Sequence, residues 1–562
     1  MCRQASTILG PILLVCSVTS DILRPNGPRT CLAESGCLQG RYFTSPNGTQ
    51  YEAYLGVPYA RPPVGELRFK NPQPVEPWTG NYNATFERAK CVQKNDLEPN
   101  ASVEGSEDCL YMNVYKPQLS KNPDKPLAVL VYIHGGGYFA GSASQGEFGP
   151  DRFMDTGEVI VVVMQYRLGV FGFLSTGDEF ASGNFGLKDQ NAVLRWVQKN
   201  IAQFGGDPTL VTLFGQSAGG SSVQMHMMSP LSKGLFSRAV IMSGSALGFW
   251  HRPVENPLKM AQEQAAAVGI DSPSAMSSEE LVQALRQVDA LELGRSIDKL
   301  KFWHIYPLVF WRPVVEKYVD SATFISEDPR TLWANGAYHQ IPWRIGYVPN
   351  EGAFASLSLI TNKTLIDDLN KHADSYIPRM FGCKEDEKSR RMLRQRFFPD
   401  GTDEQWITEK NFKQLQDLFS EAFITFPITL SVKQHISKGT EKRTPFDIYY
   451  FSFKGNHSYS KYFAQTDLDF GVCHSDDLSY LYRAKALFKD FKPNSPELAM
   501  ATKLVDYYVQ FAYNGVTNDA CSGDCVVQEF TKSGDPDKPV KIQINKAFDE
   551  EMFAFWREIY NM

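Results

Sequence analysis

The feature that most constrains the fold is a series of short, strongly apolar runs separated by longer amphipathic segments. The apolar runs span residues 127–133, 159–164, 210–214, 239–242, 345–348 and 448–453. Runs this short and this apolar are typical of strands that are buried on both faces of a sheet. Helix-like patterns lie between several of them, for example at residues 191–204 and 260–268. The order therefore favours an α/β fold, with a largely parallel central sheet flanked by helices.

The chain of 562 residues is long enough for several average domains, but large α/β proteins often keep this length in one unit. Residues 353–440 are richer in charged and helix-forming residues than their surroundings. We expect a helical insertion there that caps the functional site and does not form a separate domain. We predict that residues 21–562 form a single domain.

The first twenty residues have the pattern of a secretory signal peptide. Arg3 supplies a positive charge, residues 8–18 form an apolar core, and the small residues before Asp21 suit a cleavage site. The alternative is an N-terminal membrane anchor, which needs about 20 apolar residues to cross a bilayer. The apolar core is shorter, so we predict a signal peptide at residues 1–20 and a secreted, extracellular protein without a membrane span.

Two further features agree with export. Asn-x-Ser/Thr sequons, which are candidates for glycosylation, occur at Asn47, Asn83, Asn100, Asn362 and Asn456. Of the ten cysteines, Cys2 and Cys16 would leave with the signal peptide, and the remaining eight are an even number that an oxidising compartment can pair. The net charge of −6 argues against nucleic acid or an anionic membrane as the main partner, because both need clustered lysine and arginine.

The strongest chemical signal is the sequence Gly-Gln-Ser-Ala-Gly at residues 215–219, directly after the apolar run at 210–214. A G-x-S-x-G motif between a strand and a helix forms a sharp turn that lifts the serine hydroxyl to the top of the sheet. The flanking glycines permit such a strained turn. Ser217 is therefore the predicted nucleophile.

A second glycine motif lies upstream. Residues 134–137 are His-Gly-Gly-Gly and follow the apolar run at 127–133. In an α/β-hydrolase this is the position of the loop that donates backbone N–H groups to the oxyanion. These groups approach a tetrahedral oxyanion closely only where side chains are absent, so glycines are expected there. A plain glycine-rich turn would not require the pairing with Ser217.

A serine hydroxyl is a poor nucleophile without a base, so the argument needs a histidine and an acid. In α/β-hydrolases they follow in the order serine, acid, histidine. His474 lies in a loop-like stretch shortly after a glycine and is the predicted base. Glu351 follows the run at 345–348 and is the predicted acid. Asp367 and Asp368, in a helical-looking segment, are weaker rivals for that role.

These residues resemble the type B carboxylesterase and cholinesterase family, from about Leu38 to the C-terminal segment. Residues 204–219 are similar to that family's nucleophile signature without a mismatch. Residues 107–114 are similar to its second signature, with Met112 in place of the usual branched aliphatic residue. The resemblance implies an α/β-hydrolase fold and hydrolysis of a small-molecule ester through an acyl-enzyme, without a metal or cofactor.

The resemblance also implies roles for individual residues. Ser217 would be the nucleophile, His474 the general base and then acid, and Glu351 the group that orients the imidazole and balances its charge. The implied oxyanion-hole donors are Gly136, Gly137 and Ala218.

Further residues would support the site. Ser243 resembles a hydroxyl that steadies the acid. The implied structural pairs are Arg68 with Glu107, Arg167 with Asp189, and the disulfide Cys91 with Cys109. The pairing of the other exported cysteines stays open: Cys31, Cys37, Cys383, Cys473, Cys521 and Cys525.

The resemblance bears on the substrate too. Cholinesterases carry a tryptophan in the early disulfide loop, whose ring holds a quaternary ammonium; residues 92–108 contain no aromatic residue, so choline esters are poor candidates. The glutamine before Ser217 and the pattern Gly-x-x-His-x-x-Asp at residues 471–477 are similar to insect carboxylesterases, including juvenile hormone esterases. That similarity implies apolar or terpenoid esters. Phe249 and Trp250 would shape the acyl pocket, or else pack in the core.

Two alternative functions remain open. Some relatives of this family are adhesion ectodomains or prohormones that have lost catalytic residues, but here all three triad positions are filled. A lipase that acts on insoluble lipid would need an exposed apolar lid, which the sequence does not reveal.

Overall fold

The computed structural model describes residues 27–98, 101–402, 404–439, 443–464, 468–521, 525–535 and 537–562. The predicted signal peptide at residues 1–20 and the sequon at Asn100 lie outside the described residues. Within the described ranges, none of the helices combines the length and the apolar character that crossing a membrane requires.

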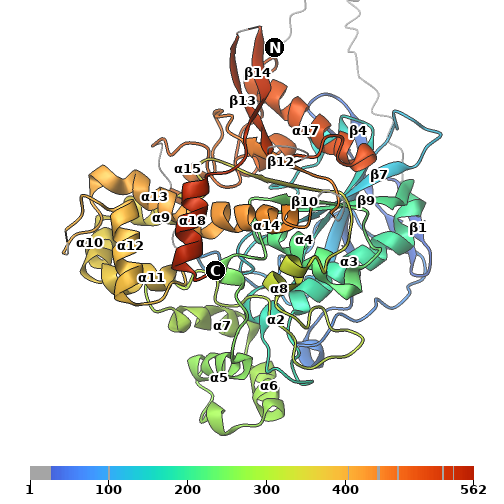
Figure 1. Ribbon diagram of the computed structural model, residues 1–562. Helices are drawn as coiled ribbons and strands as arrows, with labels where there is room; N and C mark the ends of the chain where they lie inside the picture. The colour runs from blue at the N-terminus through green and yellow to red at the C-terminus, as the bar shows by residue number, and fades with distance from the viewer. Residues whose placement is uncertain are drawn as a thin grey trace, which may run out of the picture.

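A mixed sheet runs through the centre of the molecule (Figure 1), and the described residues contribute eleven strands to it. The strands are β3 (Arg41–Thr44), β4 (Gln50–Pro58), β6 (Tyr111–Pro117), β7 (Leu127–Ile133), β8 (Val159–Met164), β9 (Gly206–Gln216), β10 (Arg238–Met242), β11 (Trp343–Tyr347), β12 (Phe446–Phe451), β13 (Val526–Asp535) and β14 (Lys538–Lys546). Their order is β14-β13-β12-β11-β10-β9-β7-β8-β6-β4-β3. A separate small sheet holds β1 (Arg29–Leu32), β2 (Gly36–Gln39) and β5 (Asn81–Asn83).

The strands from β8 to β13 pair in parallel, and antiparallel strands close both ends of the sheet. The prediction of a largely parallel central sheet is therefore confirmed. The apolar runs coincide with β7 and β8, whereas β9 begins four residues before its run, at Gly206. The start of β9 carries Asp207 and Thr209 and is partly exposed, so the apolar pattern does not reveal it.

Helices cover both faces of the sheet. They are α1 (Asp151–Met154), α2 (Gly169–Phe173), α3 (Phe185–Asn200), α4 (Ala218–Met228), α5 (Pro257–Ala267), α6 (Ser278–Gln287), α7 (Ala290–Arg295), α8 (Pro329–Asn335), α9 (Ala353–Ile360), α10 (Lys363–Lys371), α11 (Ala373–Met380), α12 (Glu387–Phe397), α13 (Phe412–Ser420), α14 (Phe426–Ile436), α15 (Ser460–Ala464), α16 (Leu478–Leu481), α17 (Pro496–Asn514) and α18 (Glu550–Ile559). Local sequence sets where α17 begins. The side chain of the N-cap Ser495 accepts from the Leu498 N–H, and proline occupies the first helical position.

The central strands serve two hydrophobic cores at once. In β7, Val129, Val131 and Ile133 belong to one core, while Leu130 and Tyr132 belong to the other. Because successive side chains of a strand point to opposite faces, a strand covered on both sides must be apolar throughout. The first core also holds α3 and α4, and the second holds α17.

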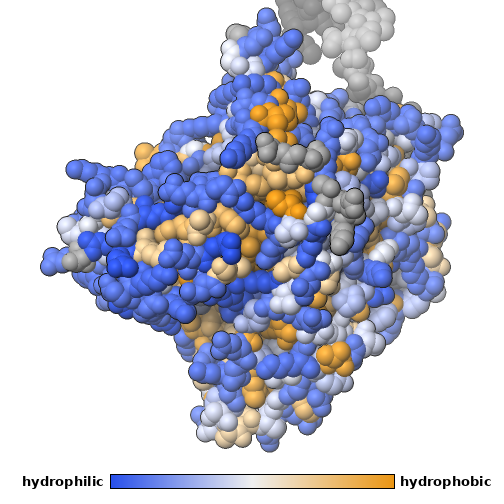
Figure 2. All heavy atoms as spheres, in the orientation of Figure 1, coloured by the Kyte–Doolittle hydropathy of each residue, from blue (hydrophilic) through white to orange (hydrophobic). Residues whose placement is uncertain are grey.

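The described part of the segment 353–440 is mostly helical, as predicted. Helices α9 to α13 lie together at one side of the molecule, and the C-terminal helix α18 lies between them and α14 (Figure 1). Phe354 of α9 and Phe423, in a π-helical turn at Glu421–Thr425, line the cavity over the central strands. The hairpin β13–β14 projects at the top of Figure 1, with Ile542 and Ile544 exposed, and Figure 2 shows hydrophobic residues in this region of the surface.

Candidate active site

Ser217 occupies the turn between β9 and α4, with φ 59° and ψ −123°. This conformation is costly for a residue with a side chain, by about 1–3 kcal/mol, and persists where the surroundings enforce it. Here the enforcing contacts are close: a Cβ added to Gly219 would lie 2.1 Å from the Ile133 carbonyl oxygen, and one added to Gly215 would lie 2.5 Å from the Gly219 backbone. The two glycines therefore allow the turn to fit against β7.

The loops after β11 and β12 bring Glu351 and His474 together. The Asn350 N–H donates to the Val472 carbonyl (3.0 Å), and the Asn350 side-chain oxygen accepts from the Val472 N–H (3.1 Å). Gly471 lies under this contact with φ +82°, and an added Cβ would meet the Asn350 side-chain oxygen at 1.9 Å. The turn that leads to His474 therefore needs a glycine at position 471.

Glu351 is fully buried and binds the histidine directly. Its Oε2 lies 2.5 Å from His474 Nδ1, and its Oε1 accepts from the Val348 N–H at 2.9 Å. Because a carboxylate only accepts, Nδ1 must carry the proton of a neutral imidazole, and Nε2 is then the free acceptor. The two rival acids have other partners: Asp367 pairs with Lys363, and Asp368 accepts from Trp303 Nε1.

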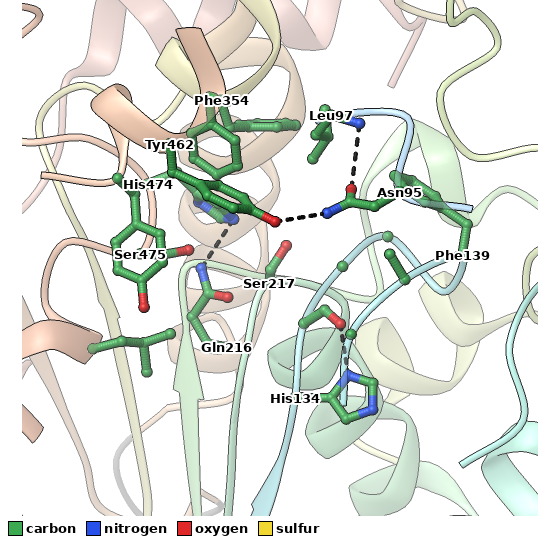
Figure 3. A pocket seen from close by; sticks show the side chains of 18 of the residues that line it. Asn95, Leu97, His134, Phe139, Gln216, Ser217, Phe354, Tyr462, His474 and Ser475 are labelled. Carbon is green, nitrogen blue, oxygen red and sulfur yellow. Dashed lines mark hydrogen bonds between the residues drawn. The ribbon is translucent and has the colours of Figure 1, made fainter. Parts of the chain in front are cut away.

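Sequence reasoning missed one neighbour of His474. The side-chain nitrogen of Gln216 lies 2.9 Å from His474 Nε2, and both side chains are buried. Figure 3 shows this contact beside the Ser217 hydroxyl, which points into the cavity. Nothing in the spacing of the two residues, which are 258 positions apart, signals the contact.

The glycine loop after β7 lies across the cavity from the histidine. Gly136 and Gly137 have φ of +96° and +58°, and a Cβ on Gly136 would lie 2.2 Å from the Ala140 carbonyl oxygen. Both glycines line the same cavity as Ser217. Ala218 is the first residue of α4, immediately after the serine. The three residues predicted to donate to the oxyanion therefore lie around Ser217.

His134, which precedes the glycines, has a structural place. Its ring stacks on Tyr166 with centroids 4.4 Å apart, and its Nδ1 lies 2.8 Å from the Gly135 carbonyl oxygen. Burial lowers the pKa of His134 to about 4. The ring therefore stays neutral and packs beneath the loop.

Ser243 differs from the expectation. Its N–H donates to the Gly346 carbonyl at 2.8 Å, but its buried hydroxyl has no hydrogen-bond partner among the described residues. The structure therefore shows no hydrogen bond between the Ser243 hydroxyl and Glu351, whose two carboxylate oxygens accept from His474 and from the Val348 N–H.

The implied structural pairs are present. Arg68 binds Glu107 at 2.5 Å and Arg167 binds Asp189 at 2.7 Å. Cys91 is joined to Cys109, closing the loop that forms one wall of the cavity. The pairings left open from the sequence are Cys31 with Cys37 and Cys521 with Cys525, while Cys383 and Cys473 are free thiols.

The cavity over Ser217 has a volume of about 270 Å³ and mostly apolar walls. One group of lining side chains is Trp250, Leu308, Val309, Phe354, Phe423 and Ile424. Of the two residues proposed for an acyl pocket, Trp250 lines the cavity. Phe249 does not line it and packs on Phe423, with ring centroids 4.8 Å apart.

A polar cluster crosses the cavity above Ser217. The Asn95 side-chain N–H donates to the Tyr462 hydroxyl at 3.1 Å, and Tyr462 in turn donates to the Glu98 carboxylate. Asn95 and Glu98 lie in the loop closed by the Cys91–Cys109 disulfide, whereas Tyr462 lies in α15. Figure 3 shows the Asn95–Tyr462 bond spanning the space above Ser217.

Two buried carboxyl groups follow the histidine. Burial raises the pKa of Asp476 to about 8 and that of Asp477 to about 6. Asp476 accepts from the backbone N–H groups of Tyr459 and Cys473, and Asp477 accepts from the Tyr449 hydroxyl. These contacts fix the backbone on both sides of His474.

The described sequon asparagines lie at the surface. Asn47, Asn83, Asn362 and Asn456 are all exposed. The Asn47 side-chain nitrogen donates to Asp155 at 2.8 Å, and the Asn362 side-chain oxygen caps α10.

Comparisons with known proteins add to the geometry. The family model described as "Carboxylesterase family" matches residues 28–556. Juvenile hormone esterase of Tribolium castaneum is 38% identical over 85% of this chain and 82% of its own, and venom carboxylesterase-6 of Apis mellifera is 33% identical over 93% of each chain. The crystal structure of juvenile hormone esterase from Manduca sexta, with OTFP covalently attached, has a TM-score of 0.79 and 27% identity, and covers 95% of this chain and 99% of that one.

Proposed function

This chain belongs to the carboxylesterase family and is a carboxylic ester hydrolase, and from that premise we propose that Ser217, His474 and Glu351 are its catalytic triad. The observation that carries the proposal is the 2.5 Å bond between His474 Nδ1 and the buried Glu351 carboxylate, at the edge of the cavity that holds the Ser217 hydroxyl. A serine nucleophile, a base and a group that orients the base are the parts that acyl transfer needs.

In the first half-reaction, Ser217 Oγ attacks the ester carbonyl carbon and its proton passes to His474 Nε2. Glu351 keeps the other ring proton on Nδ1 and balances the imidazolium charge. When the tetrahedral intermediate collapses, the bond to the alcohol oxygen breaks and His474 returns the proton to that oxygen. The alcohol leaves and the acyl group stays on Ser217.

In the second half-reaction, water replaces the alcohol. His474 takes a proton from water as the water oxygen attacks the acyl carbon, and the bond to Ser217 Oγ then breaks. The proton returns to the serine and the carboxylic acid is released. No step consumes a further reactant.

The backbone N–H groups of Gly136, Gly137 and Ala218 would hold the oxyanion in both halves. The two glycines have positive φ and line the cavity beside Ser217, while Ala218 begins α4 with its N–H unpaired within the helix. Loss of one such donor costs about 2.7–4 kcal/mol of transition-state stabilisation, or roughly 100- to 1000-fold in rate.

The cavity favours an apolar ester. Its walls carry aromatic and aliphatic side chains, including Trp250, Phe354 and Phe423, which would exclude water from the acyl or alcohol chain. Juvenile hormone hydrolysis is the second candidate. It is supported by the similarity to two proteins named juvenile hormone esterase, one by sequence and one by structure.

We further propose that the protein is secreted, that residues 1–20 are its signal peptide and that residues 21–562 are one domain. Three disulfides among the described residues suit an oxidising compartment. The exposed asparagines Asn47, Asn83, Asn362 and Asn456 are accessible to glycosylation, and Asn100 is a further candidate from its sequon.

The test is hydrolysis of p-nitrophenyl acetate, butyrate and palmitate, acetylthiocholine and juvenile hormone by the wild-type protein and Ser217→Ala. Ser221→Ala is the matched control, since this buried serine lies one turn along α4 and its hydroxyl makes no hydrogen bond in the described structure. We expect turnover that Ser217→Ala abolishes and Ser221→Ala retains. Equal turnover by wild type and Ser217→Ala would overturn the triad, and high efficiency with the hormone alone would select the second candidate.

A further inference from the structure

The side chain of Gln216 has a place that the proposed mechanism does not yet use. Its amide nitrogen lies 2.9 Å from Nε2 of His474, the atom that must receive the proton of Ser217. The other hydrogen bonds of His474 show which end of the Gln216 amide faces the ring. Because Glu351 holds the ring proton on Nδ1, Nε2 is an acceptor, and only the NH₂ end of Gln216 can satisfy it.

This bond is available in one protonation state only. When Nε2 is unprotonated, the amide N–H donates to it; once Nε2 is protonated, two donors face each other. The amide oxygen lies beside Gly135, where an added Cβ would be 2.7 Å from it, so the donor leaves Nε2 only if the amide turns. Gln216 thus favours the unprotonated imidazole and competes with the Ser217 hydroxyl for the same lone pair.

We propose that Gln216 is a positioning residue: its amide occupies Nε2 of His474 in the free enzyme, holds the ring unprotonated and turned toward the cavity, and yields that nitrogen to Ser217 when an ester is bound. The inference rests on the proposed triad. It adds that the residue before the nucleophile sets how readily His474 acts as a base.

Other charged groups face the same ring and must be separated from this effect. Glu351 is bonded to it, and Asp477 lies close enough for its charge to interact with the ring. Across the cavity are Glu98 and Glu147, the latter paired with Lys90 at 3.6 Å. Because burial raises the pKa of Asp477 to about 6, its own titration falls within the pH range of interest.

The experiment compares the acid limb of the pH profile of kcat/KM, on p-nitrophenyl butyrate, between wild type, Gln216→Met and Gln216→Glu. Methionine keeps the length of the side chain but donates nothing, so the acid limb should move to higher pH by about 0.5–1 unit, the value of one neutral hydrogen bond. Glutamate places an acceptor at Nε2 and stabilises the protonated ring, so the limb should move up by about 1–2 units. Repeating all three in an Asp477→Asn background removes the titration of that carboxyl.

The outcomes are distinct. A limb that moves up in the order wild type, methionine, glutamate supports the inference. An unmoved limb in both variants, or a glutamate shift no larger than the methionine shift, overturns it, even if activity falls, because a side chain that only fills space changes rates without moving the profile. Thermal unfolding checks that each variant is folded. Failure of the triad itself would appear differently, as turnover that survives Ser217→Ala.

Discussion

Replacing Glu351 with glutamine tests the role of the carboxylate most sharply, because it changes one atom and removes one charge. In the wild-type structure Oε1 accepts from the Val348 N–H and Oε2 accepts from His474 Nδ1. A glutamine can keep only its oxygen on one of these donors. If the oxygen stays with the Val348 N–H, the new NH₂ faces Nδ1, which must then become an acceptor.

That exchange reverses the tautomer of the imidazole. The ring proton moves to Nε2, so the lone pair that should receive the Ser217 proton is gone, and no negative charge balances the imidazolium. The equivalent carboxylate-to-amide change in a serine protease triad lowers kcat by about 10⁴-fold, or about 5 kcal/mol in activation free energy. We expect a loss of this order here. Glu351 is fully buried, so solvent does not stabilise the imidazolium charge in place of the carboxylate.

The assay is steady-state hydrolysis of p-nitrophenyl butyrate by Glu351→Gln, with Asp367→Asn as the matched control. Asp367 is the rival acid from the sequence, and its exposed side chain pairs only with Lys363 in the described structure. The control should retain wild-type activity within about twofold, since exposed ion pairs contribute about 0–1 kcal/mol. A loss below tenfold in Glu351→Gln, with normal thermal unfolding, would refute the assignment of the acid.

Three further predictions concern stability and the oxyanion site. Asp447→Asn should lower the free energy of unfolding by about 3–5 kcal/mol in urea titrations, because it leaves the buried Arg344 guanidinium unpaired; a change under 1 kcal/mol would contradict this. Burial raises the pKa of Asp477 to about 6 from 3.8, so between these pH values the folded chain holds a proton that the unfolded chain has released. The free energy of unfolding should therefore fall by about 1–3 kcal/mol as the pH rises from 4 to 6. Asp477→Asn should lack this contribution. Gly136→Ala should lower kcat/KM at least about 100-fold, since its φ of +96° and the Ala140 carbonyl oxygen leave no room for a Cβ; unchanged turnover would remove Gly136 from the oxyanion site.

The parts of the site that could be predicted are those that local sequence encodes. The elbow at residues 215–219 needs glycines because its backbone touches β7, and that requirement leaves a pattern in neighbouring positions. The order serine, acid, histidine follows the order of parallel strands, whose loops lie at one edge of the sheet. The fold was also predictable from local sequence, because strands that are buried on both faces are apolar throughout.

The parts that could not be predicted depend on side chains that meet only after folding. Gln216 reaches His474 because β9 and the loop after β12 lie at the same sheet edge, and no local pattern encodes the rotamer that brings the amide to Nε2. Trp250 and Phe249 are adjacent in one short turn, yet only Trp250 lines the cavity. Ser243 is close in sequence to a conspicuous strand end, but its hydroxyl finds no partner in the described structure.

The hydrogen bond that crosses the cavity is a further case. Asn95 and Tyr462 lie 367 positions apart in the sequence, and Asn95 lies in the loop that the disulfide Cys91–Cys109 closes. Disulfide closure of a loop reduces the freedom of the unfolded chain and restricts where the loop can lie. The sequence shows the loop but not what it contacts.

The central claim is that Ser217 is the nucleophile, and peptide-mapping mass spectrometry after exposure to diisopropyl fluorophosphate tests it most directly. The account predicts one adduct per chain, on the peptide that carries Ser217, with loss of esterase activity in proportion to labelling. An adduct on another residue that accounts for the lost activity, or ester hydrolysis that persists when Ser217 is fully modified, would contradict it.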